Sequence, residues 1–206
     1  LDYGIFYEFI PMDTFGTPNQ KVVRLSQVEL FKNYAMVITT NGGLWRYLIG
    51  DTVRFTSLSP YRIRVTGRTK HHINVFGEEL MVENTDQALA KACQETQSEI
   101  VDYTVAPIFM EGKQKGAHEW MIEFKTPPKD LTLFHKILDT TLQSLNSDYE
   151  AKRYNNMTLN PLVINVAREN LFYDWLKQRN KVGGQNKIPR LSNQREYLEQ
   201  LQELNI

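Results

Sequence analysis

The first stretch whose residue types could do chemistry is TTNGGLWRYLIGD, residues 39–51. It ends in Gly50 and Asp51, so that an acid directly follows a glycine at the predicted end of a strand. A carboxylate held on a tight turn can accept hydrogen bonds from both hydroxyls of a ribose, and glycine permits such a turn. By itself, the dipeptide is more typical of an ordinary Gly-Asp turn.

The second stretch is VTGRTKHHINVFGEEL, residues 65–80, in which Arg68 follows a glycine and precedes Lys70. Arginine donates in a planar fork that suits ribose or phosphate oxygens, and glycine allows unusual backbone angles where domains swivel. Taken alone, the stretch also fits a basic hairpin loop facing water. His71 and His72 predict no metal site, because adjacent strand residues point to opposite faces and no other ligand completes the spacing.

The third stretch is GGQNKIPR, residues 183–190, a glycine-bearing loop with Lys187 between polar residues and a proline. Two glycines favour a mobile arm, and a lysine on such an arm can act as a point charge against phosphate or carboxylate. The simpler interpretation is an exposed loop lysine.

The elements that would position these residues change in character along the chain. Residues 1–68 read as strands separated by glycine and proline turns, with strands expected at Tyr3–Ile10, Ala35–Thr40, Thr52–Thr56 and Tyr61–Thr66. The first third is therefore predicted to be mostly antiparallel sheet.

From residue 70 the pattern becomes mixed. Strands are expected at Ile73–Phe76, Ile100–Met110, His118–Lys125 and Leu162–Ala167, and helices at Asn84–Gln97, 131–145, Asn170–Gln178 and Asn193–Leu204. Asn84 or Thr85 is the expected N-cap of the first helix, and Asp130 lies near the start of the second.

The order β, α, β, β, α, β between residues 72 and 167 is that of the split βαβ, ferredoxin-like unit. The fold class is therefore predicted to be α+β, with a strand-rich part at residues 1–69 and an α+β domain at residues 70–206. A fold of this kind gives no function by itself.

The composition excludes some classes of partner. Lys plus Arg and Asp plus Glu each total 24, so no net charge attracts the chain to nucleic acid or an anionic membrane. No apolar run approaches the length of a membrane span. The single cysteine, Cys93, is read as a small apolar residue on a buried helix face, and it fits a reducing, cytoplasmic location.

Taken together, the stretches resemble the auxin-responsive promoter family of acyl-acid amido synthetases. Residues 39–51 look like its Thr-Thr, Gly-Leu, Arg-Tyr, Gly-Asp signature, and YEFIP, residues 7–11, looks like its upstream strand. The resemblance covers essentially the whole chain, and it extends to the wider superfamily that activates carboxylates as acyl-AMP. It implies that residues 1–69 end the large adenylating domain and that residues 70–206 form a mobile C-terminal domain.

The resemblance also implies roles for individual residues. Asp51 would hold the ribose hydroxyls of ATP or AMP, Arg68 would contact the ribose, and Tyr47, in the Arg-Tyr pair, would contribute to the nucleotide site. Lys70 would be the hinge. Lys187, with its Lys-x-Pro-Arg surroundings, would enter the site for adenylation, where its charge stabilises the phosphoryl oxygens. Mg2+ would accompany ATP.

Other parts of the family pattern are missing from this sequence. The Ser/Thr/Gly-rich phosphate loop and the aromatic-to-glutamate adenine motif normally lie upstream, so the chain is expected to be the carboxy-terminal portion of a ligase that lacks its N-terminal adenylating half. Gly77 departs from the plant enzymes, so hormone specificity is not carried over. The acid stays open, and the acceptor is expected to be an amino acid amine, with thiols and hydroxyls as alternatives.

Two other functions compete with the ligase. The first is a stand-alone binding or regulatory module that kept the fold without catalysis. The second is a ferredoxin-like RNA binder, which the neutral charge balance and the absence of an aromatic RNP pattern disfavour.

Overall fold

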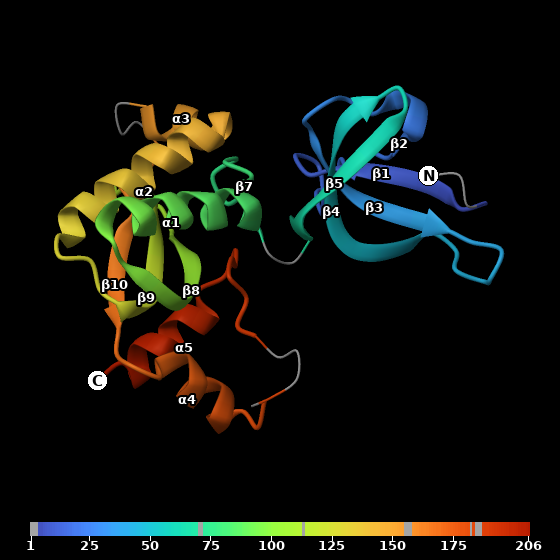
Figure 1. The fold of residues 1–206 in the computed structure, drawn as a ribbon. Coiled ribbons are helices and arrows are strands. Elements are labelled where there is room, and N and C mark those ends of the chain that lie inside the picture. Colours follow the sequence, from blue (N-terminus) through green and yellow to red (C-terminus); the bar gives the residue numbers. More distant parts are fainter. Residues whose placement is uncertain (1–3, 70–71, 113, 155–157, 182, 184–186) are drawn as a thin grey trace. The chain divides into compact units, whose positions relative to one another are not determined.

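A computed structural model describes residues 4–69, 72–112, 114–154, 158–181, 183 and 187–206 (Figure 1). The chain forms two compact units, Leu1–Lys70 and His71–Ile206. Each unit has its own hydrophobic core and is considered by itself.

The first unit is an antiparallel sheet with the strand order β2-β1-β3-β4-β5. Its elements are β1 (Phe6–Pro11), β2 (Val23–Arg24), a 3-10 helix η1 (Leu25–Gln27), β3 (Asn33–Thr39), β4 (Tyr47–Leu58) and β5 (Tyr61–Arg68). Phe9, Tyr34 and Phe55 pack edge to face in the core, with ring centroids 5.1 to 6.0 Å apart. Phe9 and Phe55 lie in predicted strands, whereas Tyr34 lies one residue before the strand expected at Ala35–Thr40.

Strand β4 corrects the predicted position of Asp51. The sequence placed Gly50 and Asp51 at a strand end, but both lie inside β4. Thr52 pairs with Ala35, and Leu48 pairs with Val37. Between these two pairs, β4 has three residues, 49–51, and β3 has only one, Met36. Gly50 has φ +89, a conformation that a residue with a Cβ rarely adopts. A glycine bulge, and not a chain-reversing turn, therefore carries Asp51.

The second unit contains a three-stranded sheet of order β10-β9-β8, a separate strand pair β6-β7, and five helices among its described residues. Its strands are β6 (His72–Ile73), β7 (Leu80–Met81), β8 (Glu99–Ile108), β9 (Ala117–Thr126) and β10 (Val163–Ala167). Its helices are α1 (Val82–Thr96), α2 (Leu131–Leu145), α3 (Ser147–Arg153), α4 (Leu171–Gln178) and α5 (Glu196–Leu204).

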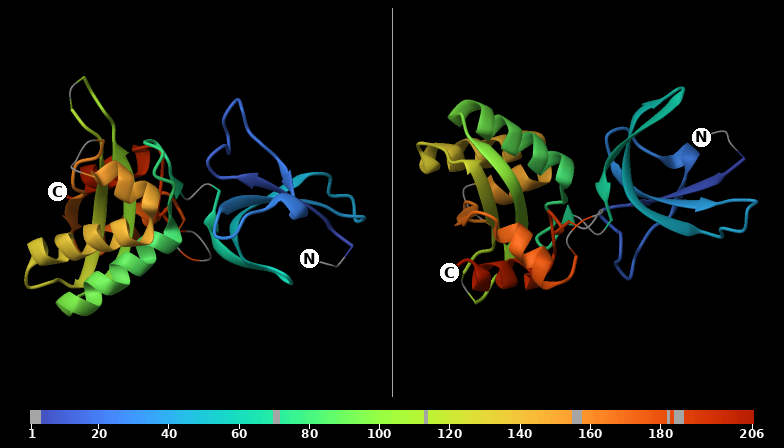
Figure 2. Two further views of the ribbon diagram at one scale, coloured as in Figure 1. Left: turned by 90° about the horizontal axis from the view of Figure 1, so that it is seen from above. Right: turned by 60° about the horizontal axis from the view of Figure 1, so that its bottom comes forward.

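Helices cover both faces of the three-stranded sheet (Figures 1 and 2). On one face Trp120 and Ile122 of β9 join a core cluster with α1 and α2, while Met121, between them, joins a second cluster with α4 and α5. Successive strand residues point to opposite faces, so β9 is buried on both sides. This explains why β9 is a nearly continuous run of buried residues.

The α+β class is confirmed, but the strand pairing differs from the predicted split βαβ unit. Strand β10 pairs directly with β9 in parallel, and β6 pairs with β7. The strand expected at Ile73–Phe76 already ends at Ile73. Asn74 Oδ1 accepts from Glu79 N at 3.1 Å, and Glu78 Oε2 accepts from Phe76 N at 2.7 Å, and these bonds fold the chain back after Ile73.

The predicted N-cap of α1 was wrong, whereas Asp130, expected near the start of α2, is the N-cap of that helix. Helix α1 starts at Val82, and Asn84 acts from inside its first turn by accepting from Met81 N at 3.0 Å. At α2, Asp130 Oδ1 accepts from Thr132 N at 2.9 Å and from Leu133 N at 3.0 Å. These bonds satisfy two backbone donors that have no partner within the helix.

We expect Asp130→Ala to lower the free energy of unfolding of the second unit by about 1 kcal/mol, because both capping bonds are lost. Urea unfolding followed by circular dichroism measures the change. Asp130→Asn is the matched control, since its amide oxygen can still accept. Equal losses in the two variants would contradict the capping role.

None of the helices in the described part of the chain has both the length and the apolar character needed to cross a membrane.

Candidate functional site

Asp51 and Arg68 are direct cross-strand partners on β4 and β5. Arg68 Nε lies 3.3 Å from Asp51 Oδ1, and the two side chains are 61% and 37% exposed. Residues directly opposite in an antiparallel pair share one face of the sheet. A surface pair of this kind contributes little stability, so both groups can be recruited by a ligand. The structure thus brings together two of the predicted site residues.

The backbone that carries this pair is held by several hydrogen bonds. Thr69 donates to Gly50 O from its backbone N at 2.9 Å and from its hydroxyl at 3.3 Å. The buried hydroxyls of Thr52 and Thr66 lie 3.1 Å apart. These bonds connect the bulge of β4 to β5 and to Thr69, the residue after β5. They therefore hold the backbone that carries Asp51 and Arg68.

Tyr47 is the first residue of β4 and is 51% exposed. Its neighbour Arg46 has φ +45, donates from its backbone N to Thr39 Oγ1, and pairs with Glu8 through Nε at 2.9 Å. Among the described residues, no hydrogen bond or ion pair links Tyr47 to Asp51 or Arg68. Tyr47 therefore shares strand β4 with Asp51, but no described side-chain bond joins the two residues.

Lys187 belongs to the second unit, and its side chain is exposed. The next residue, Ile188, is buried in the cluster of α4 and α5. Lys187 thus directly precedes the residue at which the chain enters this core cluster. Lys70, the predicted hinge, lies outside the described residues, as does His71.

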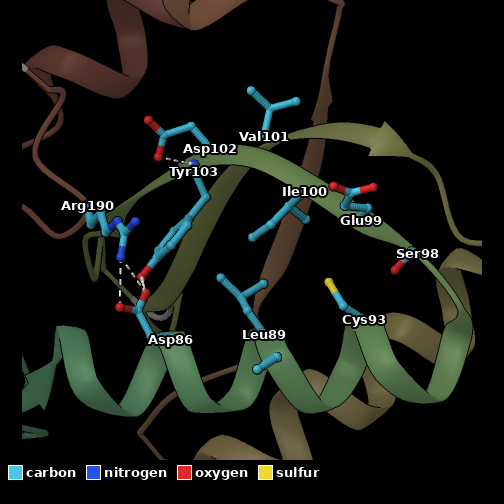
Figure 3. A pocket seen from close by; sticks show the side chains of 11 residues that line it. Asp86, Leu89, Cys93, Ser98, Glu99, Ile100, Val101, Asp102, Tyr103 and Arg190 are labelled. Carbon is cyan, nitrogen blue, oxygen red and sulfur yellow. Dashed lines mark hydrogen bonds and ion pairs between the residues drawn. The ribbon is translucent and has the colours of Figure 1, made fainter.

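The second unit has a pocket of about 420 Å³ between α1, β8 and the segment after Lys187 (Figure 3). Leu89, Cys93 and Ile100 line its apolar part, and Asp86, Tyr103 and Arg190 line the polar end. Burial raises the pKa of the Cys93 thiol, which fits the predicted apolar role. Asp51 and Arg68 are not part of this pocket.

Sequence reasoning missed the link between Arg190 and Asp86 at this polar end. Arg190 Nη1 lies 2.8 and 2.7 Å from the two carboxylate oxygens of Asp86. Arg190 was visible in GGQNKIPR, but its partner lies 104 residues away in sequence. A local sequence pattern does not identify partners that lie so far apart in the sequence.

In the parts of the chain that the structure describes, no three or more His, Cys, Asp or Glu side chains gather as metal ligands would. His72 is buried on β6, opposite Met81.

Residues 1–68 match the GH3 family central domain, and residues 83–196 match the GH3 family C-terminal domain. The chain is 28% identical over 204 residues to indole-3-acetic acid-amido synthetase GH3.3 of Arabidopsis thaliana, covering 90% of this chain and 33% of that protein. It is 24% identical over 204 residues to 4-substituted benzoates-glutamate ligase GH3.12 of Arabidopsis thaliana, covering 90% and 35%. The chain therefore spans about a third of the length of these relatives.

Among solved structures, the fold is similar to that of GH3.15 acyl acid amido synthetase, with a TM-score of 0.67 and 22% identity. The match covers 97% of this chain and 36% of that chain. The two matched domains follow one another along the sequence, one in each compact unit. The resemblance first seen in the short motifs is thereby confirmed, and the chain belongs to the GH3 family.

Proposed function

We propose that this chain is the carboxy-terminal portion of an ATP-dependent acyl-acid amido synthetase. The full-length ligase would activate a carboxylic acid as acyl-AMP and transfer the acyl group to an acceptor, an amino acid amine. Membership of the GH3 family supports this class of reaction, since the relatives named above are an amido synthetase and a glutamate ligase. The N-terminal adenylating half would supply the phosphate loop and most of the acid pocket.

The observation that carries the proposal is the cross-strand pair of Asp51 and Arg68. Asp51 bonds Arg68 through Oδ1, which leaves lone pairs on both carboxylate oxygens for the two ribose hydroxyls. Arg68 keeps further N–H donors in a planar fork for ribose oxygens. Both side chains are exposed enough for a nucleotide to reach them, so the residues present fit a ribose. Tyr47 would add a contact to the nucleotide.

Lys187 would serve the chemical step. When the substrate carboxylate attacks the α-phosphate, two anions approach each other and negative charge grows on the phosphoryl oxygens. An ammonium group lowers the energy of that arrangement without transferring a proton. Mg2+ would enter with the phosphates of ATP. In this scheme residues 1–69 end the large adenylating domain, residues 70–206 form the mobile C-terminal domain, and Lys70 is the hinge.

The reaction would take place in the cytoplasm. Cys93 is a free thiol in the structure, and such a thiol fits a reducing compartment.

ATP–pyrophosphate exchange by the full-length ligase, with a panel of carboxylic acids, tests the reaction class. An acid that supports exchange identifies the substrate, and amino acids added afterwards identify the acceptor. A full-length protein that binds ATP but shows no exchange with any acid would favour the non-catalytic binding module.

We expect Asp51→Ala in the full-length ligase to weaken ATP binding about tenfold or more, because each hydrogen bond to a charged acceptor contributes roughly 1.5 to 3 kcal/mol. Isothermal titration calorimetry measures the Kd. Glu8→Gln is the control, since it changes a carboxylate that pairs with Arg46 in the same sheet. An unchanged Kd in Asp51→Ala would leave Asp51 as part of a structural bulge.

A further inference from the structure

The segment directly after Lys187 is attached to the edge of the sheet at β8. Val105 N donates to Arg190 O at 2.9 Å, and Ser192 N donates to Val105 O at 3.1 Å. Thr104 Oγ1 donates to Pro189 O at 2.7 Å. These bonds extend the sheet by a short parallel bridge, so residues 189 to 192 are attached to β8.

The side chain of Arg190 adds a second attachment, to helix α1. Its Nη1 lies within 2.8 Å of both oxygens of Asp86, and its guanidinium carbon lies 5.3 Å from the centroid of the Tyr103 ring. The Tyr103 hydroxyl donates to Asp86 Oδ1 at 2.7 Å and lies 2.7 Å from Thr85 Oγ1. Figure 3 shows Arg190 and Tyr103 converging on the Asp86 carboxylate. One carboxylate therefore joins α1, β8 and the lysine segment.

Tyr103 is a rigid support for this carboxylate. Its side chain is 1% exposed and stacks on Trp120 with ring centroids 5.6 Å apart. Burial raises the pKa of Tyr103 strongly, and the charge of Asp86 raises it further, so its hydroxyl remains a donor. The position of Asp86, and with it that of Arg190, is therefore set by the core.

The ion pair itself is half exposed, with side-chain exposures of 37% for Arg190 and 44% for Asp86. A pair this exposed contributes little to global stability. The small contribution of this ion pair to stability therefore does not explain why it is present.

Lys187 shares this neighbourhood. Burial raises the pKa of Asp102 on β8, while the Tyr103 N–H and the positive charges of Arg190 and Lys187 act in the opposite direction. The lysine lies three residues before Arg190, with only Ile188 and Pro189 between them. Proline fixes its own φ and restricts the residue before it, so an orientation imposed at Arg190 is passed on toward Lys187.

We propose that Arg190 is a positioning residue for Lys187: its ion pair with Asp86, supported by the Tyr103 hydroxyl, sets the direction in which the lysine segment leaves the sheet. This role rests on the proposed function, because it matters only if Lys187 acts in adenylation. Arg190 touches no substrate in this scheme. It limits the positions that the Lys187 ammonium group can reach.

The test uses the full-length ligase with Arg190→Gln and, separately, Asp86→Asn. Each is expected to slow ATP–pyrophosphate exchange about tenfold, within the range that a 1 Å misplacement of a reacting group can cost. Transfer from a ready-made acyl-adenylate should stay within about twofold of wild type, because the lysine serves only the first half-reaction. Arg190→Lys should restore part of the rate, since it keeps the charge but not the planar fork.

Arg168→Gln is the matched control. Arg168 Nη1 pairs with Asp174 at 2.8 Å, with side-chain exposures of 39% and 39%. Its loss should affect urea stability as little as the loss of Arg190 and should leave exchange unchanged. Equal slowing of both half-reactions by Arg190→Gln, or a loss of exchange matched by Arg168→Gln, would overturn the positioning role.

The Lys187→Ala background separates positioning from a merely structural effect. There Arg190→Gln should cause no further loss of exchange, because residues that act through one another are not additive. A further tenfold loss in that background would overturn the proposal. Slow exchange in Lys187→Ala with normal exchange in Arg190→Gln overturns the positioning role alone. Normal exchange in Lys187→Ala overturns both that role and the proposed function of the lysine.

Discussion

Replacing Lys187 with alanine in the full-length ligase is expected to slow ATP–pyrophosphate exchange roughly a hundredfold or more, the scale seen when one preorganised electrostatic group is removed. The reason is that the ammonium meets charge that develops as the carboxylate attacks the α-phosphate. Bound ATP carries less of that charge, so the Kd for ATP should change little. Exchange kinetics and calorimetry together measure the two effects.

The second half-reaction provides the internal control. Supplied with a ready-made acyl-adenylate, the Lys187→Ala enzyme should transfer the acyl group at near the normal rate, because the lysine acts before that step. Lys181→Ala is the matched variant, since Lys181 is also an exposed lysine between α4 and Lys187. It should leave both half-reactions unchanged.

Three results would contradict this assignment in different ways. Equal losses in both half-reactions would make Lys187 a structural residue. A rise in the Kd for ATP as large as the loss of exchange would make it a ground-state binding residue. No loss in either half-reaction would leave it as surface charge.

The elements predicted most accurately from the sequence were those with a regular pattern of apolar residues. The apolar stripe of Leu131, Phe134, Leu138, Leu142 and Leu145 predicted α2; the three middle residues are buried in the core, whereas Leu131 and Leu145, at the helix ends, are exposed. The strands expected at Ile100–Met110 and His118–Lys125 also agree with β8 and β9 within about two residues at each end. In both cases one local pattern, the 3.6-residue repeat or two apolar runs around a polar turn, is enough to define the element.

Two elements were predicted wrongly, each for its own reason. Helix α3 was missed because seven residues are too few for a periodic stripe, although Asn146 caps it by accepting from Tyr149 N at 2.8 Å. The strand expected at Ile73–Phe76 is shorter because side-chain bonds of Asn74 and Glu78 fold the chain back after Ile73. Asn193 also binds this turn, accepting from Asn74 N at 2.9 Å and donating to His72 O at 3.0 Å. A sequence pattern does not reveal a partner about 120 residues away.

Some features of the candidate site were predicted from the sequence, and others were not. Motif order led to Asp51 and Arg68, and the structure makes them cross-strand partners, but the glycine bulge beneath them was mistaken for a turn. Glycine before an acid indicates a special backbone conformation without specifying which one. The ion pair of Arg190 with Asp86 could not be predicted, because it joins a loop to a helix 104 residues earlier in the sequence.

The buried ion pair of Asp139 and Arg153 is expected to show the largest effect on stability. Asp139 accepts from Tyr149 Oη at 2.8 Å, from Arg153 Nε at 3.1 Å and from Arg153 Nη2 at 2.7 Å. The two charged side chains are only 9% and 6% exposed. Burial alone would lower the pKa of Arg153, but its hydrogen bond with Asp139 and the charge of that group raise it. The pair thus fastens α3 to α2.

Asp139→Asn should lower the free energy of unfolding of the second unit by about 3 to 5 kcal/mol, because it leaves the Arg153 charge buried without a counterion. The asparagine amide also turns a donor toward the guanidinium. Urea unfolding measures the loss, and Lys125→Met, which breaks the exposed pair of Lys125 with Glu99, should cost less than about 1 kcal/mol. The double variant Asp139→Leu with Arg153→Met removes both charges and should recover most of the stability, since apolar groups can replace a buried pair. A double variant as unstable as Asp139→Asn would show that the hydrogen bonds to Tyr149 and Leu159, and not the unpaired charge, determine the loss.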